Sequence, residues 1–300
     1  MTMAPMTRST AERGVRSFPF GAFDLDDALA AKAASGLSVS ACIPARDEAA
    51  TVGAVVERIR TELVDAGLVD EVVVVDDHST DGTGALAAAA GATVVDAATV
   101  LADHGEGHGK GEALWKSVHQ SSGDLVVWVD ADIVEFDPGF LIGLLGPLLT
   151  DPSISFVKGH YHRPEADGVG GGRVTELLAR PMLSLYFPEL AEIAQPLAGE
   201  YAGRRSLLEQ LPFVVGYGVD VALLIDAVRT VGLGGIAQVD LGVRRHRNRT
   251  LDELGPQALA VGQAILDRAG VRPAGDAVLH RPGREPLAVP LVERPPLASL

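Results

Sequence analysis

The sequence predicts an α/β fold in which a mostly parallel, Rossmann-like sheet is flanked by helices. Short apolar segments of strand length alternate with segments of helical periodicity between residues 37 and 159, and this alternation is typical of βαβ units. Polar clusters directly follow three of the apolar segments. Ligands bind outside the carboxyl ends of the strands in such sheets, so the clusters predict one shared crevice.

The N-terminal half holds the regular part of this pattern. Residues 1–22 show no periodicity and are expected to be disordered. The helix over residues 48–66 carries valine, isoleucine and leucine on one face and ends at Gly67. Strands are expected over residues 37–43, 71–76, 92–96, 124–132 and 154–159, and further helices over residues 24–34, 84–90, 111–121 and 138–149. We expect the last of these strands to complete the sheet.

The C-terminal half is expected to be more helical. The run Gly170–Gly172 marks a break in the chain, and helices are predicted near residues 174–186 and 219–231. An apolar, strand-like segment over residues 236–243 precedes a basic run. From Arg272 on the chain is rich in proline, which favours an extended tail or an arm that wraps a partner.

Composition narrows the class of protein. The chain of 300 residues is 47% hydrophobic, enough to bury a core as one large or two small domains. Its net charge of -15 argues against nucleic-acid binding, which depends on Lys and Arg. Cys42 is the only cysteine, so an intrachain disulfide and a thiolate-rich zinc site are excluded. Because no apolar run is long enough for a membrane span or a signal peptide, we expect no membrane contact and a cytoplasmic location.

The segment 124–132 predicts a metal and diphosphate site, because a buried apolar run ends in two carboxylates. Asp130 and Asp132 are two residues apart, so in an extended segment they face the same way. Mg²⁺ (or Mn²⁺) binds through one or two carboxylates and completes its shell with water and phosphate oxygens. His246 could supply a third ligand. The alternative is an acidic turn that caps the next helix.

Two further clusters point to the same crevice. Pro44–Glu48 follows the first strand, and Asp76–Thr83 follows the second, although Ser, Thr, Asp and Gly are also what ordinary turns use. The loop Gly105–Gly111 is one residue short of a Walker motif and lacks its Ser or Thr, which excludes a P-loop ATPase. Lys110 and the following helix start could instead face a nucleotide, or the loop could be a mobile surface segment.

Two basic segments could bind an anionic substrate in this acidic chain. After the break, the sequence predicts a site for a phosphate or carboxylate, made of glycines, a helix start, Arg173 and Thr175. The alternative is a plain linker. The run Arg244–Arg249 holds four arginines in six residues. Such a run is often a solvated face, but its position directly after a strand favours a ligand-facing loop.

Eight segments taken together resemble one family. They are Pro44–Glu48, Asp76–Thr83, Gly109–Trp115, Asp130–Asp132, Gly170–Leu177, Gly199–Ala202, Gly216–Asp220 and Ala237–Arg249. They resemble the glucosyl-3-phosphoglycerate synthases and the closely similar mannosyl-3-phosphoglycerate synthases, in the same order from about residue 37 to 270. The resemblance implies a GT-A glycosyltransferase that acts on a nucleotide-sugar donor and 3-phosphoglycerate. It would transfer the sugar to the 2-hydroxyl with retention, with UDP-glucose favoured as donor, usually as a homodimer.

The same resemblance divides the chain and assigns residues to roles. It implies a nucleotide-sugar-binding half over residues 23–165, a helical acceptor-binding half over residues 166–270, and a tail over residues 271–300. The donor would be bound by Pro44, Ala45, Glu48, Asp77, Lys110, Asp130 and Ala131. The acceptor would be bound by Gly172, Arg173, Thr175, Arg244 and Asn248. The metal would be held by Asp132 and His246, and the catalytic residues would be Asp132, Asp220, Tyr217 and Arg244.

Alternatives remain open at this point. Asp220 stands where the glucosyl enzymes carry Glu, and the turn after the second strand also differs, so a mannosyl-3-phosphoglycerate synthase that uses GDP-mannose is the nearest alternative. An inverting transferase for polyprenyl phosphate would need a membrane-binding part, which the sequence lacks. A non-catalytic nucleotide-binding regulatory module would have no use for an acceptor site with Arg173.

Overall fold

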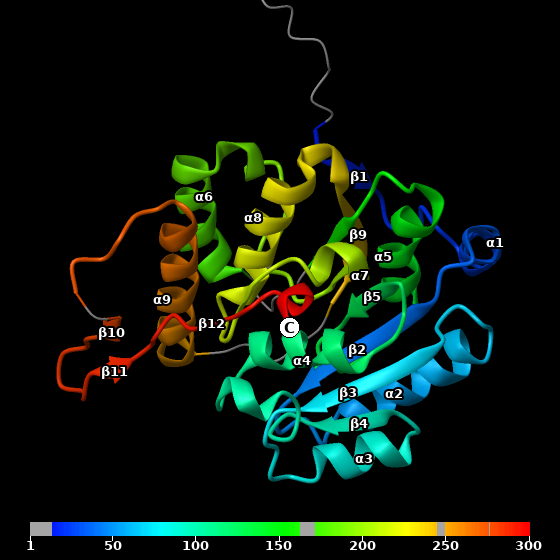
Figure 1. Ribbon diagram of the computed structural model, residues 1–300, viewed down its shortest axis with the longest axis horizontal. Coiled ribbons are helices and arrows are strands. Elements are labelled where there is room, and N and C mark those ends of the chain that lie inside the picture. Colours follow the sequence, from blue (N-terminus) through cyan, green and yellow to red (C-terminus); the bar gives the residue numbers. More distant parts are fainter. Residues whose placement is uncertain (1–13, 163–171, 245–249, 276) are drawn as a thin grey trace, which may run out of the picture.

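The computed structural model describes residues 14–162, 172–244, 250–275 and 277–300. Its central element is an eight-stranded sheet with the strand order β1-β9-β6-β7-β5-β2-β3-β4 (Figure 1). The strands of this sheet are β1 (Arg16–Phe18), β2 (Val39–Ala45), β3 (Glu71–Asp76), β4 (Thr93–Asp96), β5 (Leu125–Trp128), β6 (Phe156–His162), β7 (Tyr201–Arg204) and β9 (Ile236–Val243). The main helices are α1 (Leu25–Ser35), α2 (Val52–Ile59), α3 (Thr83–Ala89), α4 (Lys110–Gln120), α5 (Gly139–Thr150), α6 (Arg180–Tyr186), α7 (Arg205–Leu208), α8 (Val219–Val231) and α9 (Leu251–Arg268). None of the described helices is long and apolar enough to span a bilayer.

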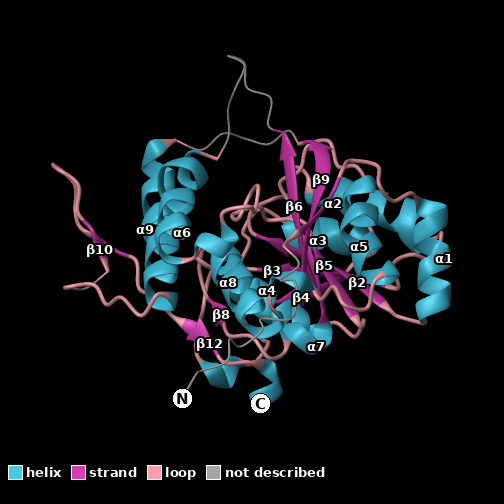
Figure 2. Cartoon of the chain, turned by 90° about the horizontal axis from the view of Figure 1, so that it is seen from above, coloured by secondary structure: helices cyan, strands magenta, loops and turns pink. Residues whose placement is uncertain are grey.

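Helices cover both faces of the sheet, as Figure 2 shows from above. Successive strand residues point to opposite faces, and in β3 this places Val72 and Val74 in one hydrophobic core and Val73 and Val75 in the other. The first core packs against α1, α2 and α5, and the second against α4 and α8. The predicted layered α/β architecture is therefore confirmed.

Strand β7 corrects the expected extent of the sheet. We expected the sheet to be complete after residues 154–159, but β7 pairs antiparallel with both β5 and β6 and separates them. Strand β9 then extends the sheet beyond β6 in parallel. The expected disorder of residues 1–22 is also wrong for Arg16–Phe18, which pairs with β9 as strand β1; residues 1–13 lie outside the described part. The single sheet thus contains strands from both expected halves.

The C-terminal segment packs on its own chain, where an extended tail or a partner-wrapping arm was expected. Strand β12 (Glu293–Arg294) pairs with β8 (Phe213–Val214), and the Trp115 indole donates a hydrogen bond to the Pro295 carbonyl at 2.9 Å. Arg294, 5% exposed, donates to the buried carboxylate of Glu112 at 2.6 Å. It also donates to the Gly105 carbonyl at 2.9 Å. The tail therefore holds α4 and the glycine loop in place.

Arg294→Ala is expected to lower the free energy of unfolding by about 3 kcal/mol, because it leaves Glu112 buried with Lys116 as its remaining ion-pair partner. Urea unfolding followed by circular dichroism measures the change. Arg284→Ala is the matched control, because Arg284 lies in the same segment and pairs with Asp252 at the surface; its unfolding midpoint should not move. Equal midpoints for both variants would show that the Arg294 contacts do not stabilise the fold.

Candidate active site

A pocket of about 330 Å³ opens at the carboxyl ends of β2, β3 and β5. All the predicted site residues in the described part line it: Pro44, Ala45, Glu48, Asp77, Lys110, Asp130, Ala131, Asp132, Gly172, Arg173, Thr175, Tyr217, Asp220 and Arg244. The remaining two, His246 and Asn248, lie outside the described residues. The strand-end rule and the two basic segments therefore converge on one cavity.

Arg244 joins the two carboxylates that follow β5. Its Nη2 lies 3.1 Å from Asp130 Oδ2 and 2.7 Å from Asp132 Oδ1. On its other side, Nη1 lies 2.9 Å from the buried carboxylate of Glu200 and donates to the Tyr161 hydroxyl at 2.8 Å. Burial alone would lower the pKa of Arg244, but these neighbours, Glu200 foremost, raise it well above its ordinary value. The guanidinium is therefore a permanent charge inside the site.

Lys110 provides a second buried cation at the first turn of α4. Its Nζ lies 3.0 Å from Asp130 and 3.2 Å from Asp220. Burial disfavours its charge, yet the carboxylates of Asp130, Asp220 and Glu200 outweigh this effect and raise the pKa of Lys110. Conversely, burial would raise the pKa of Asp130, but Lys110 and Arg244 lower it below its ordinary value. Asp130 is therefore ionised at neutral pH.

The lack of a side chain at Gly199 permits the contact between Lys110 and Asp130. A Cβ atom there would lie 2.3 Å from Asp130 Oδ2 and 2.5 Å from Lys110 Nζ, distances that side-chain carbons do not adopt. The next two residues belong to the same cluster: Glu200 meets Arg244, and the Tyr201 hydroxyl donates to Asp220 at 3.0 Å. The segment Gly199–Tyr201, which leads into β7, therefore supplies a polar wall of the site, and strand prediction missed β7.

Lys158 of β6 lies behind this wall and is almost fully buried. Its ammonium lies 4.1 Å from the centre of the Tyr201 ring, a cation–π contact. Burial lowers the pKa of Lys158 to about 8, although Asp220 acts in the opposite direction. The same burial, together with Asp220, raises the pKa of Tyr201 well above 10, so this hydroxyl stays protonated and donates to Asp220.

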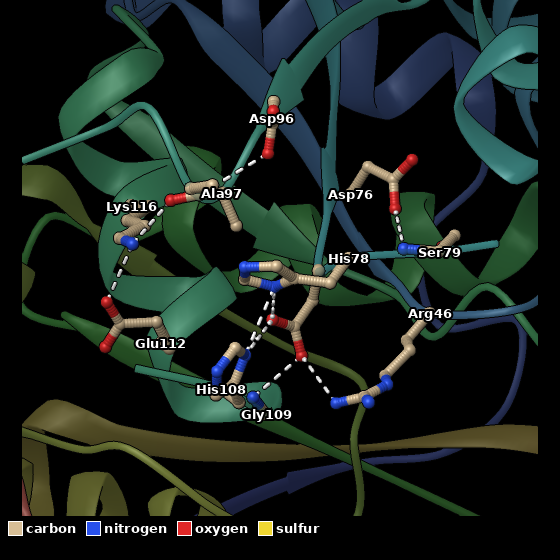
Figure 3. Close-up of polar contacts among 12 residues, drawn as sticks. Arg46, Asp76, His78, Ser79, Asp96, Ala97, His108, Gly109, Glu112 and Lys116 are labelled. Atoms are coloured by element: carbon tan, nitrogen blue, oxygen red, sulfur yellow. Dashed lines mark hydrogen bonds and ion pairs between the residues drawn. The ribbon is translucent and has the colours of Figure 1, made fainter. Parts of the chain in front are cut away.

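Hydrogen bonds from backbone amides to side chains hold the loops at the predicted nucleotide end of the pocket. The Glu48 amide donates to Thr83 Oγ1 at 2.8 Å, and the Thr80 amide donates to Asp47 at 2.8 Å. The Ser, Thr and Asp side chains of the cluster Asp76–Thr83 thus form turn hydrogen bonds, which was the alternative interpretation of this cluster. Asp77 is buried and accepts from the Gly109 amide at 2.7 Å, with Arg46 nearby in Figure 3.

The predicted acceptor end lies across the pocket. Gly172 adopts a φ of 81°, which favours glycine, and Arg173 and Thr175 follow it. The helix expected over residues 174–186 begins as a π-helical segment, Thr175–Ala179, and continues as α6. Residues Leu254, Gln257 and Val261 of α9 complete this wall. Sequence reasoning missed them because they lie mid-helix and not after a strand.

The donor set around Asp132 fits a divalent cation. Asp130 and Asp132 present carboxylate oxygens at the pocket, and hard cations prefer such ligands. The Ala131 carbonyl between them accepts a 2.6 Å hydrogen bond from Thr51, which holds the backbone in place. Two cationic side chains contact Asp130 and one contacts Asp132. The carboxylate oxygens of this pair therefore attract positive charge.

Comparisons with known proteins agree with this geometry. The model of glycosyl transferase family 2 matches residues 40–211. Glucosyl-3-phosphoglycerate synthase of Mycolicibacterium smegmatis is 46% identical over 285 residues, which cover 91% of this chain and 93% of that protein. The crystal structure of the Mycobacterium tuberculosis synthase with Mn²⁺, UDP-glucose and phosphoglyceric acid has a TM-score of 0.87 at 44% identity, covering 95% and 98%. Mannosyl-3-phosphoglycerate synthase from Rubrobacter xylanophilus has a TM-score of 0.88 at 40% identity, covering 95% and 97%.

Proposed function

Because this chain belongs to glycosyltransferase family 2 and, within it, to the glucosyl-3-phosphoglycerate synthases, we propose that it transfers glucose from UDP-glucose to 3-phosphoglycerate. The relative of known structure binds UDP-glucose and phosphoglyceric acid together, and it has also been solved with glucosyl-3-phosphoglycerate, UDP and Mn²⁺. The observation that carries the proposal is the single pocket, because the carboxylate pair and the Arg173 segment both line it. The expected GT-A fold is confirmed.

The donor side is organised around the leaving group. Pro44, Ala45, Glu48 and Asp77 hold the nucleoside, and Asp130 and Ala131 contact the nucleotide beside Lys110. Asp132 and His246 would hold Mg²⁺ or Mn²⁺, which would supply positive charge to the diphosphate leaving group. Lys110 and Arg244 are held by several carboxylates each, so their charges need no reorganisation when the donor binds.

The acceptor side orients a small substrate with two anionic groups, a phosphate and a carboxylate. Gly172, Arg173 and Thr175 grip the phosphate, and Arg244 and Asn248 face the glycerate end. Tyr217 and Asp220 contact hydroxyls of the sugar or acceptor. The acceptor 2-hydroxyl oxygen bonds to the anomeric carbon on the face that the diphosphate leaves, and its proton passes to the departing phosphate. Retention follows, and no covalent intermediate on a side chain is needed.

One observation favours the mannosyl enzyme as the second candidate. Asp220 is shorter than the Glu of the glucosyl family, and the Rubrobacter mannosyl enzyme matches this fold as well as the glucosyl enzymes do. In this structure the Asp220 carboxylate contacts Lys110 and Tyr201, so it approaches any sugar from the floor of the pocket. A donor panel separates the two candidates.

Arg173→Ala is expected to weaken the acceptor by about one to two decades while the donor is nearly unaffected. A charge-assisted contact with phosphate contributes roughly 1.5 to 3 kcal/mol. Calorimetry with 3-phosphoglycerate and with UDP-glucose measures both affinities. Arg58→Ala, on the exposed side of α2 and paired with Glu62, is the control and should change neither. Equal losses for both ligands would remove Arg173 from the acceptor site.

Three further features stay proposals. We propose a homodimer, which the exposed Leu177 and Leu185 of the adjoining π-helical segment and α6 support, and light scattering of the purified chain tests it. We also propose a cytoplasmic location, tested by fractionating cells. Finally, we keep the division near residue 166 as a functional one, with donor residues before it and acceptor residues after it.

A further inference from the structure

Three side chains that converge at the outer edge of the pocket form a separate cluster. Asp77 and His78 follow β3, and His108 comes from the glycine loop before α4. His78 Nδ1 lies 3.0 Å from Asp77 Oδ1, His108 Nδ1 lies 3.2 Å from His78 Nδ1, and His108 Nδ1 lies 3.9 Å from Asp77 Oδ1. Figure 3 shows the rings of His78 and His108 turned toward each other.

The spacing of these atoms matches a metal coordination sphere. A tetrahedral zinc ion with bonds of about 2.0 Å places its ligand atoms about 3.3 Å apart. The 3.0 Å and 3.2 Å separations are close to this value, and the 3.9 Å separation between His108 and Asp77 would close by a small rotation of the exposed His108 side chain. The open side of the triangle, where both histidines are exposed, leaves room for water as a further ligand.

The ligand atoms are of the kind that a cation uses. A carboxylate oxygen and an imidazole nitrogen can each offer a lone pair to a metal ion. Asp77 remains held while it binds, because its second oxygen accepts from the Gly109 amide at 2.7 Å.

The backbone keeps His78 in this position. His78 has a φ of 62°, in the left-handed region that residues with side chains seldom adopt. The turn thereby directs the imidazole across to the glycine loop. The described part of the chain contains no other group of three such ligand side chains at this spacing.

We propose that Asp77 Oδ1, His78 Nδ1 and His108 Nδ1 bind a transition-metal ion of the zinc class, separate from the cation at Asp132. Two imidazoles with one carboxylate suit Zn²⁺, Co²⁺ and Ni²⁺, whereas the carboxylates of Asp130 and Asp132 suit Mg²⁺ and Mn²⁺. The ion links the turn after β3 to the loop that ends at Gly109. It thereby fixes the start of α4, where Lys110 enters the active site. This site goes beyond the proposed transfer reaction, although it shares Asp77 with the predicted nucleoside end of the pocket, and its test measures Zn²⁺ binding without transfer.

The test uses the full chain without a histidine tag, stripped of metal and then supplied with excess Mg²⁺ to occupy the carboxylate pair. Titration calorimetry with Zn²⁺ should show one equivalent bound. His78→Ala and His108→Ala should each weaken this binding at least about 100-fold, the upper range for loss of a metal ligand's support. Co²⁺ in place of Zn²⁺ should give a visible absorption band that both variants lose.

Two control variants make the outcome specific. His104→Ala removes an imidazole in the same loop that packs on Trp115, and Asp132→Asn removes the carboxylate of the catalytic cation; both should still bind one Zn²⁺. The proposal is overturned if the unmodified chain binds no stoichiometric Zn²⁺, or if both histidine variants bind it unchanged. Loss of Zn²⁺ binding in Asp132→Asn would also overturn it, because the ion would then belong to the catalytic pair.

Discussion

Asp132→Asn is expected to reduce the rate of glucosyl transfer by at least about a thousandfold while the chain stays folded. Removal of one electrostatic contact to developing charge costs about 10² to 10³ in rate, and loss of the cation removes several such contacts. Asparagine keeps the shape of aspartate, so the 2.7 Å contact with Arg244 can persist through its carbonyl oxygen. The loss should therefore be chemical and not structural.

Initial rates over a range of Mg²⁺ and Mn²⁺ concentrations, with circular dichroism of the same samples, measure this effect. Asp137→Asn is the matched control, because Asp137 lies five residues further along, is exposed and accepts from the Gly139 amide, which asparagine can also do. It should retain full activity. Near-normal turnover of Asp132→Asn with an unchanged metal requirement would remove Asp132 from the metal site.

Arg244→Met is expected to lower the free energy of unfolding by about 3 to 5 kcal/mol and to abolish transfer. The substitution removes the 2.9 Å contact between Arg244 and the fully buried Glu200, and it also removes the charge between Asp130 and Asp132. A buried charge that loses its partner costs about this much. Sequence reasoning assigned Arg244 to the acceptor, and these contacts add a structural role.

Denaturant unfolding measures the stability, and the double variant Arg244→Met with Glu200→Gln separates the two roles. Neutralising Glu200 should restore part of the stability, because the buried charge that lost its contact with Arg244 is then removed, but activity should stay lost. If Arg244→Met is as stable as the unmodified chain, the ion pair with Glu200 does not hold the site together.

The sequence predicts elements well where the apolar pattern is strong. The ends of β3, α8 and β9 agree with the two predicted strands and the predicted helix, because turn residues or glycines flank a continuous apolar run. The helix expected from residue 48 begins instead at Val52, since the preceding loop turns through Asp47 with a φ of 53°. Boundaries thus depend on loop geometry that the apolar pattern does not contain.

The site was predictable where it follows the strand-end rule and unpredictable where distant segments meet. Asp130 and Asp132 follow directly from a buried run that ends in carboxylates. Glu200 could not be placed in this way, because it directly precedes β7, a strand of four residues that pairs antiparallel with β5 and β6 and that the apolar pattern does not predict. Arg294 lies in a proline-rich segment whose composition favours extension, and its contacts with Glu112 and the Gly105 carbonyl, together with the pairing of β12 with β8, draw it inward.

Product analysis after incubation with a panel of donors tests the central claim most directly. The purified chain is incubated with 3-phosphoglycerate, Mg²⁺ or Mn²⁺, and UDP-glucose, GDP-glucose or GDP-mannose in turn, and each product is assigned by NMR. The proposed function predicts a glucosyl product from UDP-glucose, linked to the 2-hydroxyl of 3-phosphoglycerate with the α-configuration of the donor retained. A product formed from GDP-mannose alone, an inverted linkage, or no transfer from UDP-glucose would contradict it.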